Sequence, residues 1–199
     1  MMIKDTYLTL HGKSDGFYKE KGSKFLAFAY VVADEEEVKK NLSELKKKYY
    51  DARHHCFAYV LGKQAEKYRA NDDGEPGHTA GDPILGQIRS KDLTNTLIVV
   101  VRYFGGTKLG VSGLIHAYKT SAADAIANNS ILEKLIISEV KIQFGYDQLN
   151  NVMKLVKEFD LEIIAQKMEL SCEMQLGIRL SLDKQVKAKL HDMHKISMK

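Results

Sequence analysis

Apolar positions in the first two thirds of the chain alternate between strand-like and helix-like spacing. Stretches rich in aromatic and β-branched side chains predict strands at residues 22–33, 56–62 and 95–104. An aspartate followed by apolar positions at helical spacing and a series of lysines predicts a helix at residues 34–51. Further helices are predicted at residues 84–93 and 111–129. The polar stretch that contains both prolines is expected to be the principal loop.

A second series of elements follows residue 133. The pattern predicts a strand, a helix, two strands and a helix, at residues 135–146, 148–160, 161–171, 173–182 and 183–193. This β-α-β-β-α order is most of a split βαβ sandwich. Its final strand would have to come from residues 195–199, KISMK, which are few and only weakly strand-like. We therefore expect two domains, residues 1–133 and 134–199, in an α+β chain.

Composition changes this picture little. Of 199 residues, 44% are hydrophobic and 28% charged, and a net charge of +4 gives no overall basic field that would draw the protein onto nucleic acid. Two cysteines, Cys56 and Cys172, have no spacing typical of a zinc site or a disulfide framework. Since the longest strongly apolar run, LIVVV, is too short to span a bilayer, we expect a soluble, cytoplasmic protein without a membrane partner.

The stretch RYFGGTKLG at residues 102–110 lies between a predicted strand and a predicted helix. Backbone N–H groups of such a turn and of the helix N-terminus favour an anion. The candidate binding residues are Arg102, Tyr103, Gly105, Gly106, Thr107, Lys108 and Gly110. Because the spacing matches neither a polyphosphate loop nor a dinucleotide fingerprint, no nucleotide cofactor is expected. The alternative is that the glycines only permit a tight turn around a solvated lysine.

An acidic loop and a histidine pair supply further candidates. Their binding residues are Asp72, Asp73, Glu75, His78, Thr79, His54 and His55. Asp72, Asp73, Glu75 and His78 could assist a hydrolase or transferase by binding a divalent metal, although their spacing matches no calcium or zinc motif. The alternative is helix capping: acidic side chains would cap a helix begun near Gly77, and Asp82 would cap the helix after Pro83. Strand alternation should turn one of His54 and His55 inward. No nucleophile motif is present, so no catalytic residue is assigned.

Four stretches carry a resemblance. SKFLAF, ARHHCFAY, DDGEPGHTAGDPIL and VVVRYFGGTKLGVSGLIHAY, in that order between residues 23 and 118, resemble the YigZ/IMPACT family. The resemblance implies an N-terminal α/β domain like domain two of a small-subunit ribosomal protein and domain four of elongation factor G, with a left-handed βαβ crossover. It also implies a ferredoxin-like C-terminal domain similar to the last domain of elongation factor G. In eukaryotic IMPACT proteins the related domain is a translational regulator that opposes activation of a general-control kinase.

The resulting hypothesis is a non-enzymatic binding protein linked to translation. It would contact RNA phosphate or a ribosome-associated protein through a groove between the glycine loop (residues 102–110) and the acidic loop (residues 72–82). An adaptor that binds protein without RNA fits the near-neutral charge, and a metal-assisted enzyme is the alternative from another class. All versions of the binding hypothesis require the glycine loop to turn free amides and basic side chains outward.

Overall fold

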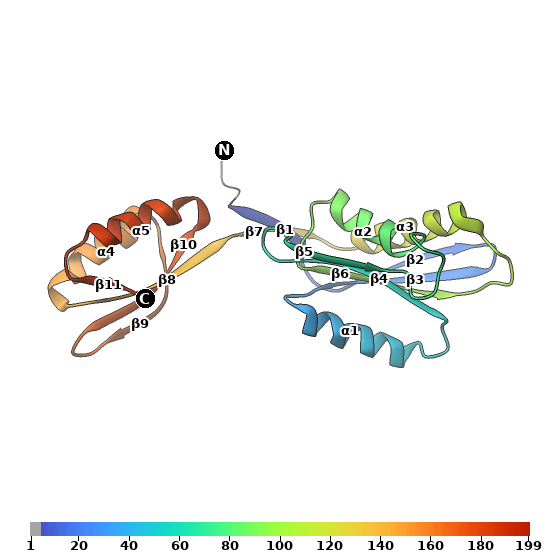
Figure 1. Ribbon diagram of the computed structural model, residues 1–199, viewed down its shortest axis with the longest axis horizontal. Coiled ribbons are helices and arrows are strands. Elements are labelled where there is room, and N and C mark those ends of the chain that lie inside the picture. The colour runs from blue at the N-terminus through green and yellow to red at the C-terminus, as the bar shows by residue number, and fades with distance from the viewer. Residues whose placement is uncertain (1–4) are drawn as a thin grey trace. The chain divides into compact units, whose positions relative to one another are not determined.

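The computed structural model describes residues 5–199, which form two compact units of mixed helices and sheets (Figure 1). One unit is Tyr7–Lys134, and the other is Leu135–Lys199 together with Asp5 and Thr6. Along the chain, the division between the units falls after Lys134. Among the described residues, no helix is long and apolar enough to cross a membrane.

A five-stranded antiparallel sheet forms the centre of the first unit. Its strand order is β2 (Ser14–Glu20), β3 (Ser23–Val31), β6 (Thr96–Tyr103), β4 (His54–Leu61) and β5 (Lys67–Asn71). Strands β1 (Thr6–Leu10) and β7 (Ile131–Leu135) pair separately. The central strand, β6, is buried from its first residue to Arg102. This burial explains the uninterrupted apolar run, because a strand covered on both faces needs no polar alternation.

Helices cover both faces of this sheet. Helix α1 (Glu35–Lys48) lies on one face, and α2 (Gly81–Ser90) and α3 (Gly110–Ala127) lie on the other (Figure 1). Successive β6 side chains enter two separate cores: Ile98 and Val100 pack under α2 and α3, whereas Leu97 and Val99 belong to the core beneath α1. The predicted cap of α1 is confirmed, since Asp34 accepts hydrogen bonds from two N–H groups of the first turn.

The second unit contains a four-stranded sheet and two helices. The strand order is β11 (Ile196–Met198), β8 (Ile137–Phe144), β10 (Cys172–Arg179) and β9 (Glu162–Met168). Helices α4 (Leu149–Glu158) and α5 (Asp183–Asp192) follow the short turns η1 (Tyr146–Gln148) and η2 (Leu180–Leu182). The final strand does form, because β11 pairs antiparallel with β8 and Ile196 lies opposite Phe144. The unit therefore has a complete β-α-β-β-α-β order.

Several short strands were not predicted from the sequence. Strand β5, KYRAN, lies inside the stretch expected to be loop and is the edge of its sheet, so most of its side chains are exposed and carry no apolar alternation. Strand β2 includes Gly16, where an added Cβ would lie 2.3 Å from the Ala125 backbone nitrogen. The glycine that weakens the strand pattern therefore allows α3 to approach closely.

Candidate functional site

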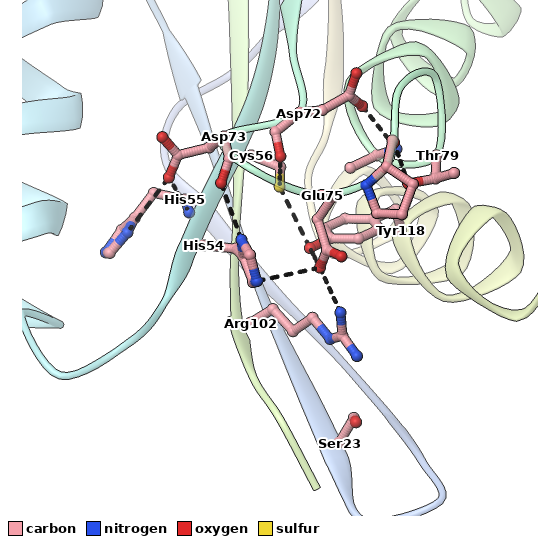
Figure 2. A network of polar contacts seen from close by, with 12 residues as sticks. Ser23, His54, His55, Cys56, Asp72, Asp73, Glu75, Thr79, Arg102 and Tyr118 are labelled. Carbon is pink, nitrogen blue, oxygen red and sulfur yellow. Dashed lines mark hydrogen bonds and ion pairs between the residues drawn. The ribbon is translucent and has the colours of Figure 1, made fainter. Parts of the chain in front are cut away.

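Arg102, His54 and Glu75 lie together at one end of the sheet face that α2 and α3 cover (Figure 2), whereas Tyr103 packs on the face beneath α1. Arg102, near the end of β6, lies opposite Phe25 of β3 and His54 of β4. Directly opposed residues project from the same face of an antiparallel sheet, so these three side chains are neighbours. The acidic loop contributes Glu75 and α3 contributes Tyr118 above them.

Glu75 and Arg102 form a buried ion pair. Arg102 Nη1 donates to Glu75 Oε1 at 2.5 Å, and the two side chains are only 7% and 4% exposed. Tyr118 donates its hydroxyl to the same oxygen at 2.7 Å, while His54 Nε2 lies 4.0 Å away. Charges leave water at a high free-energy cost, which this pairing and the tyrosine hydrogen bond offset. The binding hypothesis required Arg102 to present its charge to solvent. Arg102 instead anchors the acidic loop through Glu75.

The network continues to a buried cysteine. The Cys56 thiol donates to Tyr118 Oη at 3.3 Å and approaches the backbone oxygen of Asp72 at 3.0 Å. Burial raises the pKa of the Cys56 thiol far above its usual value, and burial is also the main cause of the raised pKa of Tyr118. Because the thiolate is the reactive form of cysteine, this burial disfavours a nucleophilic role for Cys56.

Asp72 caps helix α2. Its carboxylate accepts N–H hydrogen bonds from Gly81, Ala80 and His78 at 2.8, 3.0 and 2.9 Å. Burial opposes ionisation of Asp72, yet these N–H groups outweigh it and lower its pKa. The capping prediction is thus corrected in two details. The helix begins at Gly81 rather than near Gly77, and Asp82 lies inside its first turn.

Other members of the acidic loop have separate partners. Asp82 contacts His78 Nδ1 at 2.6 Å, and this hydrogen bond is the main cause of the raised pKa of His78. Thr79 is buried and donates its hydroxyl to the Pro76 carbonyl at 2.6 Å.

The two histidines contact Asp73. His55 is buried and donates its backbone N–H to the Asp73 carboxylate at 2.7 Å, and burial lowers the pKa of its ring. His54 is partly exposed, and its Nδ1 lies 2.9 Å from the Asp73 carbonyl oxygen, so Nδ1 carries the proton. The prediction that one ring turns inward is confirmed for His55.

The proposed metal ligands do not converge. Asp72 binds backbone N–H groups, Asp73 binds the β4 backbone and Glu75 binds Arg102. Across residues 5–199, no three side chains of His, Cys, Asp or Glu are arranged to hold a metal ion. The geometry therefore gives the metal-assisted enzyme no site among these residues.

The glycine loop itself is exposed from Phe104 to Lys108. Gly106 and Gly110 have φ angles of +87° and +73°, which side chains disfavour. Within the described chain, the N–H groups of Gly106, Thr107 and Lys108 make no hydrogen bond, and no side chain caps α3, which begins at Gly110. Tyr103 is half-buried and donates to Asp51 at 2.7 Å, which raises its pKa to about 12. Apart from Arg102, Tyr103 and Leu109, which packs against the core under α2 and α3, the loop faces solvent.

Several residues of this end were missed by sequence reasoning. The β2–β3 turn packs on the glycine loop: a Cβ on Gly105 would lie 1.9 Å from the Gly22 carbonyl carbon, and Gly105 donates its N–H to Ser23 Oγ at 3.1 Å. Exposed residues of the turn and loop form what we call the loop-end surface: Lys21, Lys24, Phe104, Gly105, Gly106, Thr107 and Lys108. None of its three lysines forms an ion pair within residues 5–199. No local sequence pattern could predict that the turn and the loop are neighbours, because they are 82 residues apart in the chain.

Comparisons with known proteins match this chain over half of its length or more. A model of the Impact N-terminal domain matches residues 21–126. The IMPACT family member YvyE of Bacillus subtilis is 35% identical over 136 residues, which are 68% of this chain and 63% of that protein. YigZ of Escherichia coli, another IMPACT family member, is 30% identical over 89% of this chain and 88% of its own length. A crystal structure of a hypothetical protein superposes with a TM-score of 0.71 and 27% identity, over 98% of this chain and 97% of that one.

Proposed function

Because this chain belongs to the IMPACT family, we propose that it is a non-enzymatic, translation-linked protein that binds RNA phosphates at its loop-end surface. The eukaryotic proteins of the IMPACT family are translational regulators. We therefore place the function of this chain in translation. In the same proposal the protein is cytoplasmic, and its two units are counterparts of domain four and the last domain of elongation factor G. The arrangement of β3, α1 and β4, with β6 inserted between the two strands, is compatible with that kinship.

The observation that carries the proposal is the chemistry of the loop-end surface. Three lysines without ion pairs lie on the same turn and loop as backbone N–H groups that have no acceptor in the described chain. Lysines and free amides are the groups that contact phosphate in nucleic-acid complexes. Phe104 is 50% exposed beside them, which adds an aromatic face. A small overall charge is no obstacle, because these contacts depend on local groups.

The experiment is a salt titration of RNA binding. Fluorescence anisotropy with a labelled single-stranded oligoribonucleotide should give an affinity that falls steeply with salt. Lys108→Gln should reduce the slope of log affinity against log salt by about one unit, because one phosphate contact is lost. Lys40→Gln is the matched control, since Lys40 is an exposed lysine of α1 away from the loop-end surface.

Two results would reject the phosphate interpretation. One is an affinity that does not respond to salt, and the other is an equal effect of the Lys108 and Lys40 variants. In either case a ribosome-associated protein becomes the better partner, and a complex that survives nuclease treatment would identify it.

A further inference from the structure

Arg102 has hydrogen-bonding capacity that the protein does not use. Its guanidinium offers five N–H groups, of which Nη1 binds Glu75. Nε is buried without any partner among residues 5–199. Nη2 is not one of these buried unpartnered atoms, and the guanidinium's hydrogen bond within the described residues is the one from Nη1. The whole residue is only 6% exposed. Buried donors of this kind are rare in folded proteins and cost free energy, so an acceptor supplied from outside the chain is the natural explanation.

A serine beside this unused edge is a second buried donor. Ser23 lies two residues before Phe25 on β3, and Phe25 is opposite Arg102, so strand alternation puts the serine on the same sheet face. Figure 2 shows the guanidinium between Glu75 and Ser23. Ser23 is fully buried, and its Oγ accepts the Gly105 N–H, which leaves the hydroxyl proton to donate. Among residues 5–199 that proton makes no hydrogen bond to a side chain or backbone oxygen.

The unused edge of the guanidinium carries only donors, so it takes an acceptor such as a negative ion. Glu75 is already occupied by Arg102 and Tyr118. The guanidinium carbon lies 5.5 Å from the buried Phe25 ring and 5.8 Å from the half-exposed Phe104 ring. Phe104 is therefore the exposed part of the cover, and its displacement would open Arg102 to the loop-end surface.

We infer that Nε and Nη2 of Arg102, together with the Ser23 hydroxyl, hold one phosphate group beneath the glycine loop. A two-pronged guanidinium edge matches two oxygens of an oxyanion. A planar carboxylate has no further oxygen for Ser23 and the loop amides, whereas a tetrahedral phosphate has two. The inference rests on the proposed anion-binding role of this end of the sheet, and it leaves the carrier as either a free phosphate or an RNA phosphate.

The test is nuclear magnetic resonance of the arginine Nε–H groups in the full chain. Inorganic phosphate is titrated at constant ionic strength, and the Arg102 signal is assigned through bonds from its backbone amide. We expect this signal to shift and saturate while those of Arg53, Arg69, Arg89 and Arg179 stay in place. Ser23→Ala should weaken phosphate binding about tenfold, as expected for loss of one hydrogen bond to a charged group. An Arg102 signal that does not move, or that moves equally with sodium chloride, overturns the inference.

Two oligoribonucleotides distinguish the carriers. If only the 5′-phosphorylated form shifts the Arg102 signal, the site takes a terminal phosphate, and if the 5′-hydroxyl form also shifts it, the site takes a phosphodiester. If only inorganic phosphate shifts it, the phosphate site at Arg102 is supported and the proposed RNA-binding function is rejected. If RNA binds with the Lys108-dependent salt slope while the Arg102 signal stays in place under all three ligands, the function stands and the site fails.

Discussion

Glu75 determines which basic side chains of the site keep an unpaired charge. It neutralises Arg102, accepts the Tyr118 hydroxyl and lies 4.0 Å from His54, so one carboxylate connects the acidic loop to β6, α3 and β4. Because Arg102 is buried in this pair, it does not belong to the loop-end surface. The outward charge comes instead from Lys21, Lys24 and Lys108.

Replacing Glu75 should destabilise the protein strongly. Glu75→Gln leaves the Arg102 charge buried without a counter-charge, and we expect the free energy of unfolding to fall by about 3–5 kcal/mol. Urea denaturation gives this value. The control is Asp82→Asn, because the Asp82–His78 pair is exposed and such pairs contribute little to stability. Similar losses in the two variants would show that burial of the Glu75–Arg102 pair has no special importance.

At the scale of elements, two turns distant in sequence hold each other in place. The β2–β3 turn and the glycine loop are in backbone contact through Gly22 and Gly105, and Ser23 connects them by a hydrogen bond. The glycine pair of the loop therefore has two different purposes. Gly105 is required by a close approach, whereas Gly106 is required by its positive φ angle.

A methyl group at Gly105 should separate these turns. Gly105→Ala brings a Cβ within 2.1 Å of the Ser23 nitrogen, and backbone atoms cannot give way as a flexible side chain can. We expect a loss of about 1–3 kcal/mol, typical of overpacking. Gly12→Ala is the control, because nothing lies within 4 Å of its added Cβ. Thermal denaturation compares the two, and equal midpoints would contradict the close approach.

For the whole molecule, the main feature is that the two units have separate cores. The cores of the first unit contain Ile98 and Val99, the core of the second contains Leu176, and no residue of 5–199 belongs to both units' cores. Each unit therefore has its own source of hydrophobic stabilisation.

Core truncations should consequently act within one unit. Ile98→Ala and Leu176→Ala each remove a fully buried side chain and should cost about 2–5 kcal/mol. Amide hydrogen exchange measures where that loss falls. We expect faster exchange in β3, β4 and β6 for the first variant, and in β8 and β10 for the second. Acceleration of both sheets by either variant would contradict separate cores.

The sequence by itself determined the elements that have strong local patterns. The LIVVV run predicted a buried strand, Asp34 predicted a helix start, and the ordered motifs indicated the family. The edge strand β5 escaped prediction because an exposed strand paired on one side carries little apolar signal. Only the tertiary structure decided which charges are free. Arg102 and Glu75 are 27 residues apart, and their pairing depends on strand register and on the path of a loop. Local periodicity contains neither of these, so the same arginine that looked like a ligand for an anion proved to be bound first by the protein's own carboxylate.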